Sequence, residues 1–383
     1  MPERGVASTR LRESSKGEAE QRHCISRDGY ADLSLTGFFK SDKVRNTRGV
    51  PGQRTLLVLS DDTRERSSGS LIGEHAARLG WRVVRATLHQ VTVRGKAPFT
   101  RLFVGNCRIR PDAAVVAFAH PASITRLESI AESLDQMGVI SYGIPTASLQ
   151  IADDKWSTQQ LAISLGLPTP ATAECRLDDP RSVREAFETI GAPAWMKAKE
   201  GSGGRQVVSV GETQELEQSR QALLARISNQ DALYSYPRRS DLDGVVQQHV
   251  GKSLGDETRF DYRIDLVDAR MVAATRRTKP APGQGTNLNQ GAVAISALDD
   301  PLVPKMVEMA RTMLTALGIE RASYDFLAGN SGEIYFNEIN PFPWMYLPNE
   351  CALGNGLTNT TLELLEARCA TQQPDLGHVA GSW

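Results

Sequence analysis

The stretch Ala322-Ser-Tyr-Asp325-Phe-Leu … Glu333-Ile-Tyr-Phe-Asn-Glu338-Ile-Asn340-Pro341 consists of two apolar runs around the turn Gly-Asn-Ser-Gly at 329–332. This pattern predicts a β-hairpin. Side chains alternate along a strand, so Glu338 and Asn340 point the same way, and folding brings Asp325 into their neighbourhood. Three hard oxygen ligands without His or Cys suit magnesium bound together with nucleotide phosphates. A solvated acidic hairpin without a ligand is the alternative interpretation.

The composition narrows the class of protein. A chain of 383 residues with 40% hydrophobic residues can bury a sizeable core in two or three subdomains. The formal net charge of −1 provides no basic excess that would favour nucleic acid. The apolar run at 113–119 is too short to span a bilayer, and the first residues lack the apolar region of a signal peptide. Five scattered cysteines and six histidines indicate reduced thiols and no zinc site. We therefore expect a cytoplasmic protein with neither nucleic-acid nor membrane partners.

The sequence divides into four regions by composition and hydrophobic pattern. Residues 1–53 are polar and predict an extension, which could be disordered. Residues 54–145 alternate strand and helix patterns and predict a small open α/β domain, without the GxGxxG of a dinucleotide site. We place a central lid subdomain at 146–245 and a C-terminal subdomain with the metal site at 246–383. The main predicted elements are helices at 70–79, 124–137, 155–165, 180–190, 214–228 and 302–317, and strands at 54–60, 81–85, 113–118, 139–142, 193–199, 206–210, 244–250, 261–267 and 270–276.

A second chemical feature is Lys197, which precedes the glycine-rich loop Gly201-Ser202-Gly203-Gly204. Glycines let backbone N–H groups approach an anion, and the lysine adds a point charge, so this segment suits phosphates. Its spacing does not match a P-loop. Lys155, at the start of a predicted helix, is a second candidate phosphate contact. Taken singly, the loop is explained better by a glycine turn without function, and Lys155 by a surface charge; the two become meaningful in combination.

The order of these motifs resembles the ATP-grasp ligases, and within them the group of ribosomal-protein-modifying glutamate ligases and glutathione-synthetase-like enzymes. The resemblance covers about residues 54–369 and is specific through order and spacing rather than through any single motif. The matching residues are Asp154-Lys155, Leu165-Gly-Leu-Pro168-Thr-Pro170, Trp195-Met-Lys197, Glu200-Gly-Ser-Gly-Gly204, Val246-Gln247-Gln248-His-Val250, Asp261-Tyr-Arg263, Arg276, Asn287-Leu-Asn-Gln-Gly291, Asp325 and Glu338-Ile-Asn340-Pro341.

The resemblance implies an ATP-grasp fold of mixed α/β and α+β class, in which an N-terminal open α/β domain precedes two α+β domains that clamp ATP. It also implies roles for individual residues. Lys155 and Lys197 would contact the phosphates, and the loop 201–204 would close over them. The strand Gln247, Gln248, His249 and Val250 would meet the adenine. Asp325, Glu338 and Asn340 would hold magnesium, two ions being expected and manganese being an alternative. Arg263, Arg276 and Asn287 would face the γ-phosphate and the incoming carboxylate.

Two departures from the family pattern stand out. Gln248 occupies a position that is commonly glutamate, which we expect to remove an anionic contact to the nucleotide. Phe342-Pro343-Trp344 replaces the usual Pro-Gly after Asn340-Pro341, which changes a wall of the substrate pocket.

The activity that the resemblance implies is ATP-dependent joining of a carboxylate to an amine through an acyl phosphate. The substrates would be small molecules or peptides, and homo-oligomers occur among relatives. Two other functions stay open: another ATP-grasp phosphotransfer such as a small-metabolite kinase, and a nucleotide-binding regulator without catalysis.

Overall fold

We describe the structure from a computed structural model of the chain. It divides into two compact units, residues 1–45 and 46–383. The residues described all lie in the second unit: 53–61, 67–95, 99–119, 123–142, 146–201, 204, 206–231, 242–250, 260–278, 292–329, 332–343 and 356–371. Within these residues no helix has the length and apolar character needed to cross a membrane.

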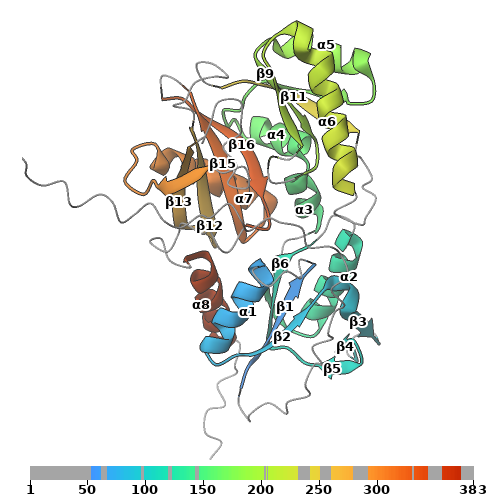
Figure 1. The fold of residues 1–383 in the computed structure, drawn as a ribbon. Helices are drawn as coiled ribbons and strands as arrows, with labels where there is room; N and C mark the ends of the chain where they lie inside the picture. Colours follow the sequence, from blue (N-terminus) through green and yellow to red (C-terminus); the bar gives the residue numbers. More distant parts are fainter. Residues whose placement is uncertain are drawn as a thin grey trace, which may run out of the picture. The chain divides into compact units, whose positions relative to one another are not determined.

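The N-terminal part holds a parallel sheet in the order β2-β1-β6-β7 (Figure 1). Its strands are β1 (Thr55–Ser60), β2 (Arg82–Ala86), β6 (Ala113–Phe118) and β7 (Ile140–Tyr142), with helices α1 (Ser68–Arg78) and α2 (Ile124–Gln136). All six residues of β1 are buried, as expected for a central parallel strand. The sequence patterns at 54–60, 113–118 and 124–137 therefore predicted these elements to within about two residues.

A second, antiparallel sheet in this part was not predicted from the sequence. After the short helix η2 (Leu88–Gln90), strands β3 (Val91–Arg94), β4 (Arg101–Val104) and β5 (Cys107–Ile109) form a three-stranded sheet in chain order. Each strand is only three or four residues long, so its alternation is too brief to be distinctive in the sequence.

The middle part is a four-stranded sheet in the order β10-β9-β11-β8. Its elements are β8 (Thr172–Arg176), α5 (Pro180–Ile190), β9 (Ala194–Ala198), β10 (Val207–Val210), η4 (Thr213–Glu215), α6 (Leu216–Asp231) and β11 (Asp243–Gln248). The side chain of Asp179 caps α5, and Gly191 follows its last residue with φ 82°. Strand β11 pairs with both β8 and β9. The expected boundary at 245/246 therefore falls inside a strand of this sheet.

The C-terminal part is a five-stranded antiparallel sheet in the order β14-β13-β12-β15-β16. Its strands are β12 (Phe260–Val267), β13 (Arg270–Thr278), β14 (Val293–Ser296), β15 (Arg321–Ala328) and β16 (Ile334–Asn340). The hairpin predicted from the opening motif is confirmed as the pair β15–β16. Four further helices of the described residues accompany the sheets: α3 (Thr146–Asp153), α4 (Lys155–Ser164), α7 (Val303–Leu317) and α8 (Gly356–Thr371).

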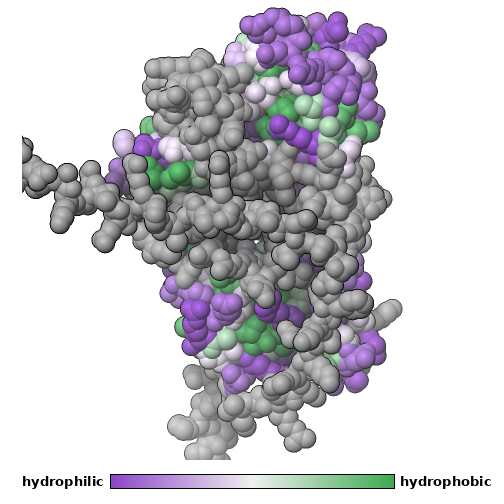
Figure 2. Space-filling model, in the orientation of Figure 1, coloured by the Kyte–Doolittle hydropathy of each residue, from purple (hydrophilic) through white to green (hydrophobic). Residues whose placement is uncertain are grey.

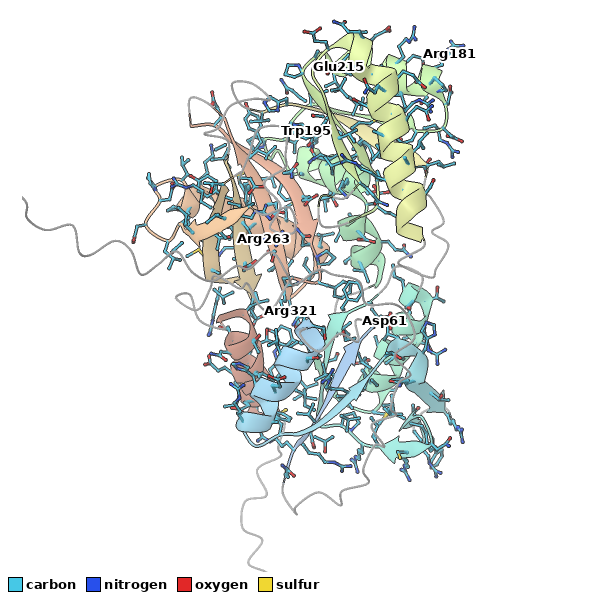
Figure 3. All side chains as sticks on the ribbon, viewed as in Figure 1. Asp61, Arg181, Trp195, Glu215, Arg263 and Arg321 are labelled. Carbon is cyan, nitrogen blue, oxygen red and sulfur yellow. The ribbon has the colours of Figure 1, made fainter. Side chains whose placement is uncertain are left out.

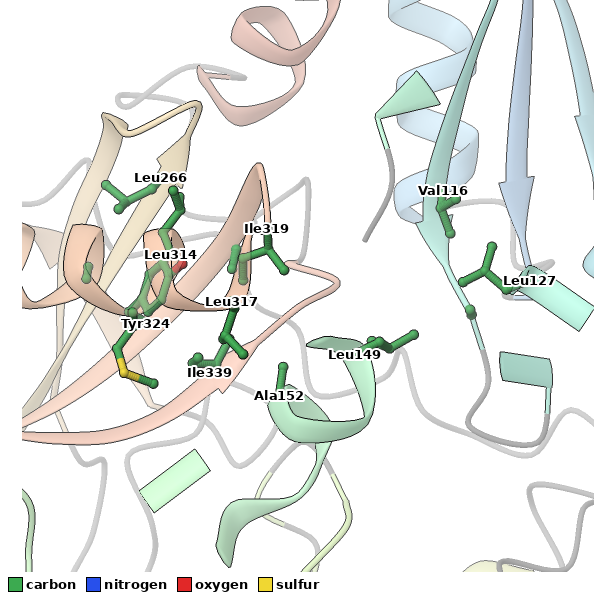
Figure 4. Packing of buried hydrophobic residues seen from close by; sticks show 14 of the residues in the cluster. Val116, Leu127, Leu149, Ala152, Leu266, Leu314, Leu317, Ile319, Tyr324 and Ile339 are labelled. Atoms are coloured by element: carbon green, nitrogen blue, oxygen red, sulfur yellow. The ribbon is translucent and has the colours of Figure 1, made fainter. Parts of the chain in front are cut away.

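One face of this five-stranded sheet is apolar and packs against α7. Leu266, Tyr324 and Ile339 belong to the same buried cluster as Leu314 and Leu317 of the helix (Figure 4). The cluster continues through Leu149 and Ala152 of α3 to Val116 and Leu127. The opposite face carries polar side chains, except at the end of β12, where Val267 belongs to a second apolar cluster with Leu362 and Leu365 of α8.

Candidate active site

The face of the five-stranded sheet opposite α7 carries a ladder of polar side chains, which we call the site face. Its buried members are Asp261, Asp265, Arg277, Ser323 and Asp325, and Arg263 among them is partly buried. They come from three adjacent strands, and cross-strand register places Asp261 beside Arg277, Arg263 beside Asp325 and Asp265 beside Ser323. Residues opposite one another on neighbouring strands share a face, so the ladder follows directly from the register.

The site face is held by short ion pairs. Arg277 donates to both carboxylate oxygens of Asp261, at 2.7 and 2.8 Å, and its Nη2 lies 3.1 Å from Asp325 Oδ2. Arg263 donates to both oxygens of Asp325, at 2.8 and 2.9 Å (Figure 3). Arg277 and Asp325 are 4% and 2% exposed. Such bidentate pairs fix both partners in one orientation.

The two arginines also determine the charge state of Asp325. Burial by itself would raise the pKa of this carboxyl, but Arg263 and Arg277 outweigh burial and hold the pKa well below its usual range. Asp265 differs, because burial dominates there and raises its pKa despite the nearby Arg263 and a hydrogen bond from Ser323. The ladder therefore contains one firmly ionised acid and one acid that is more easily protonated.

A bulge in the β15–β16 hairpin brings the three expected metal ligands together. Asp325 pairs with Glu338 and Ser323 with Asn340, whereas Phe326 pairs with Phe336, which leaves Asn337 as an extra residue. Without this extra residue Asp325 would face Asn337, and Glu338 would lie on the apolar face. The expectation that Asp325, Glu338 and Asn340 are neighbours therefore agrees with the structure, for a reason that alternation alone did not supply.

The three residues differ in how they are already engaged. Asp325 receives both arginines, and Asn340 donates from Nδ2 to Asp325 Oδ2 at 3.2 Å, which leaves the amide oxygen as an acceptor. Glu338 is half-buried, and among the described residues no hydrogen bond or ion pair engages it. The oxygens open to a cation are therefore those of Glu338 and Asn340.

A second β-bulge, in the β12–β13 hairpin, changes which arginine lies on the site face. In the β12–β13 hairpin, Leu266 pairs with Met271 but Asp265 with Ala273, so Val272 is the extra residue. This shift places Arg277 opposite Asp261 and turns Arg276 to the α7 face, opposite Tyr262. We expected Arg276 on the site face. A bulge-free hairpin would have put it opposite Asp261, and the single inserted residue exchanges it for Arg277.

Lys197 of β9 reaches toward the C-terminal sheet. Its ammonium is 2.5 Å from Gln247 Oε1 and 3.3 Å from Asn337 Oδ1, and the residue is 9% exposed. The main-chain oxygen of Asn337 accepts from Gln159 of α4 at 2.6 Å. Asn337, which sequence reasoning missed, thus joins three elements. A bulged residue next to a ligand such as Glu338 is the signal that could have found it.

Lys155 contacts the glycine loop. Its ammonium donates to the carbonyl of Gly201 at 2.8 Å, and the Lys155 backbone N–H donates to Lys199 O at 3.0 Å. Gly201 and Gly204 have φ of 132° and 66°, a conformation that favours glycine. In this structure Lys155 therefore holds the base of the loop.

The strand expected to meet the adenine alternates in exposure. Gln247 and His249 are buried, and Trp195 donates from Nε1 to His249 Nδ1 at 3.0 Å. Gln248 is exposed and accepts from the Ala171 N–H at 3.3 Å, and Val250 is half-buried. The change from glutamate at position 248 therefore alters an outward side chain, whereas the inward Gln247 carries the contact to Lys197.

The replacement of the family's Pro-Gly by Phe342-Pro343-Trp344 also has a structural counterpart. Phe342 packs edge-on against Phe118, at the end of β6, with ring centroids 5.8 Å apart. Both rings are half-buried. Ser202, Gly203, Asn287 and Trp344 lie outside the described residues, and so does the whole loop 279–291.

The donor set is compatible with magnesium. No group of three His, Cys, Asp or Glu side chains suited to a metal occurs in the described parts of the chain. Magnesium, however, is usually held by only one or two carboxylates together with phosphate oxygens and water. Glu338 and the amide oxygen of Asn340, beside the ionised Asp325, meet that requirement.

Comparisons with known structures support the fold. D-alanyl-alanine synthetase A from Vibrio cholerae is 16% identical, with a TM-score of 0.58 over 83% of this chain and 98% of that chain. The ATP-grasp ligase PsnB, in complex with a phosphomimetic variant of a minimal precursor, Mg and ADP, is 17% identical, with a TM-score of 0.57 over 82% and 98%. A RiPP-associated ATP-grasp ligase from Chryseobacterium gregarium, in complex with ADP and a leader and core peptide, is 14% identical, with a TM-score of 0.55 over 82% and 97%.

A search of curated protein sequences gave no match. The family model of the RimK-like ATP-grasp domain matches residues 152–346, slightly more than half of the chain. This range contains the glycine loop, Lys197, the site face and the β15–β16 hairpin. The chain therefore belongs to the RimK-like ATP-grasp family.

Proposed function

We propose that this protein is an ATP-dependent ligase that joins a carboxylate to an amine through an acyl phosphate, with release of ADP and phosphate. The observation that carries the proposal is the open carboxylate of Glu338 beside the arginine-paired Asp325, on the sheet that faces Lys197. Membership of the RimK-like ATP-grasp family supports it.

The first half-reaction brings a substrate carboxylate against the γ-phosphate of ATP. This approach needs positive charge that is already in place, because cations that must reorganise contribute less to the transition state. Arg263 and Arg277 provide such charge, since their bidentate pairs with buried acids hold them before any substrate arrives. Lys197 would orient the phosphates from the opposite sheet after leaving Asn337.

Magnesium, when bound with the nucleotide, would neutralise phosphate oxygens, and Glu338 and Asn340 would hold it, with Asp325 adjacent. We propose that two ions bind and that manganese can replace magnesium; metal titration would measure both. The loop 201–204 would exclude water from the acyl phosphate, which is otherwise hydrolysed. In the second half-reaction the amine nitrogen attacks the acyl carbon and phosphate leaves.

For the substrates, we propose a peptide as the partner that supplies at least one of the reacting groups. Two of the similar structures are described as complexes with a precursor or core peptide. Phe342, packed against Phe118, belongs to the segment that replaces the smaller Pro-Gly of the family pattern, so it would narrow the pocket wall. A cytoplasmic location agrees with the proposed use of ATP.

The test is a phosphate-release screen with ATP and magnesium over amino acids and short peptides, followed by mass spectrometry of the products. The expected result is phosphate release only with a productive pair, and a product whose mass is the sum of the two substrates minus one water. A substrate that gains a phosphoryl group instead would show a kinase. Nucleotide binding without turnover of any substrate would show a regulator.

A further inference from the structure

The three-stranded sheet β3–β5 has two faces of opposite character. Its inner face is apolar and joins the core through Val91, Leu102, Val104 and Ile109. Its outer face carries Arg94, Arg101 and Arg108, and Arg110 follows the end of β5; all four are exposed, and we call them the arginine face. Register shows that the first three share a side: Arg94 pairs with Arg101, and Arg108 pairs with Phe103, two residues beyond Arg101.

The charges of the arginine face are not neutralised from within the structure. Residues 88–111 contain five Arg or Lys residues and no Asp or Glu. Among the described residues no ion pair involves any of the four arginines. Arg94 and Arg101 stand directly opposite each other, an arrangement that destabilises a sheet. A like-charge pair that costs stability and has no acidic partner among the described residues is typical of a binding surface.

Two aromatic side chains accompany these charges. The guanidinium of Arg94 stacks over the Phe103 ring at 4.6 Å, which limits the orientations of both. Phe99, at the start of β4, is 74% exposed, the largest exposure among the exposed large hydrophobic side chains described. Fixed guanidinium groups next to an exposed ring fit a polypeptide that offers carboxylates and apolar groups together.

We propose that the arginine face binds an acidic segment of the polypeptide substrate, away from the reacting carboxylate. The proposal rests on the proposed ligase function for the identity of the partner. Arg101 and Phe103 lie two residues apart on the outer face of β4, and Arg108 lies opposite Phe103 on β5, so this face repeats every two residues, as side chains of an extended peptide do. Bidentate guanidinium–carboxylate pairs suit such a ladder.

A nucleic acid fits this surface less well. The Phe103 face that a base would stack on is already covered by Arg94. Exposed Glu132 and Asp135 lie on α2, which contacts β3 and whose Gln136 accepts a hydrogen bond from Thr100 of the β3–β4 turn. These carboxylates limit the length of the positive surface. In Figure 2 the visible surface over β3–β5 is mainly hydrophilic.

The experiment uses the full chain and a fluorescein-labelled hexaglutamate peptide, read by fluorescence anisotropy without ATP. The test variant combines Arg94→Gln, Arg101→Gln and Arg108→Gln. The control combines Arg181→Gln, Arg270→Gln and Lys305→Gln, which removes the same charge from exposed positions elsewhere. We expect the test variant to weaken binding about 10-fold, because each exposed pair contributes modestly, and the control about 2-fold or less.

Equal weakening in both variants would overturn the proposal, since binding would then follow net charge alone. Tighter binding of oligouridylate than of hexaglutamate would overturn it in favour of nucleic acid. For turnover, the test variant should keep its kcat/KM on peptides without acidic residues and should show a raised KM for acidic ones. The binding assay needs no ATP. It therefore tests the arginine face even if the protein turns out to have no ligase activity.

Discussion

The site face of the C-terminal sheet and the arginine face of β3–β5 are both polar sides of an antiparallel sheet whose other side joins the core. On the site face most of the charges are opposite in sign and joined in bidentate pairs between largely buried groups, as in Arg263–Asp325 and Arg277–Asp261. On the arginine face they are exposed and of one sign, and among the described residues they have no acidic partner. The charges of the site face are thus fixed in advance, which suits the stabilisation of a reaction. The charges of the arginine face stay open to a partner.

The strongest test of the buried network removes Arg277. Arg277→Gln removes the bidentate partner of the buried Asp261 and one of the two arginines that contact Asp325, which should destabilise the protein by about 3–5 kcal/mol. Arg276→Gln, one residue away on the α7 face, is the matched control, with an expected loss of about 1 kcal/mol or less. Urea unfolding followed by circular dichroism measures both, and equal losses would contradict the assigned register.

The open carboxylate is tested by Glu338→Gln. Loss of one preorganised charge contact to the nucleotide and its metal should lower kcat by about 10²-fold or more, while the melting temperature stays near that of the unmodified protein. Glu333→Gln, at the exposed start of the same hairpin strand, should leave kcat unchanged within about 2-fold. Near-normal turnover of Glu338→Gln would remove Glu338 from the site.

The two acids of the site face should respond to pH in opposite directions. The pKa of Asp325 is lowered by folding, so its stabilising contribution is present above the unfolded pKa and disappears as pH falls through the folded one. The pKa of Asp265 is raised, so protonation favours the folded state as pH falls. Each proton changes the slope by at most about 1.4 kcal/mol per pH unit.

We therefore expect Asp325→Asn to flatten the loss of stability in acid. Asp265→Asn should steepen it and should raise stability at neutral pH relative to Asp325→Asn. Urea unfolding measured between about pH 3 and about pH 7 compares the stability of the two variants. Identical pH profiles for the two variants would show that the arginines do not distinguish the acids.

The smallest expected effect concerns the arginine face. Arg101→Thr removes the like charge opposite Arg94 and should stabilise the protein by about 0.5 kcal/mol at low salt, with the gain shrinking in about 1 M salt. Arg108→Thr is the control, because its cross-strand neighbour is Phe103 rather than an arginine. Equal changes in the two variants would show that repulsion across β3–β4 is negligible.

Most of the elements could be predicted from local patterns. The fully buried β1, the capped helix α5 and the hairpin signal at 329–332 each combine a periodicity with a start or stop residue. The segments β3 to β5 and β14 were missed, because three or four residues of alternation do not stand out from a loop. The strand β8 and the helices α3 and α8 were not predicted either. The arginine face was missed with β3 to β5, since a net charge of −1 hides a local excess.

The sequence by itself determined the two hairpins, the residue types of the site and the family pattern that joins them. The tertiary structure decided which charged residues meet, through one extra residue in each hairpin, Val272 in β13 and Asn337 in β16. Because side chains alternate with a period of two, a one-residue shift moves every later side chain to the other face. These shifts place Glu338 beside Asp325 and select Arg277 over Arg276, and they depend on packing against α7 and α4 that no local pattern encodes.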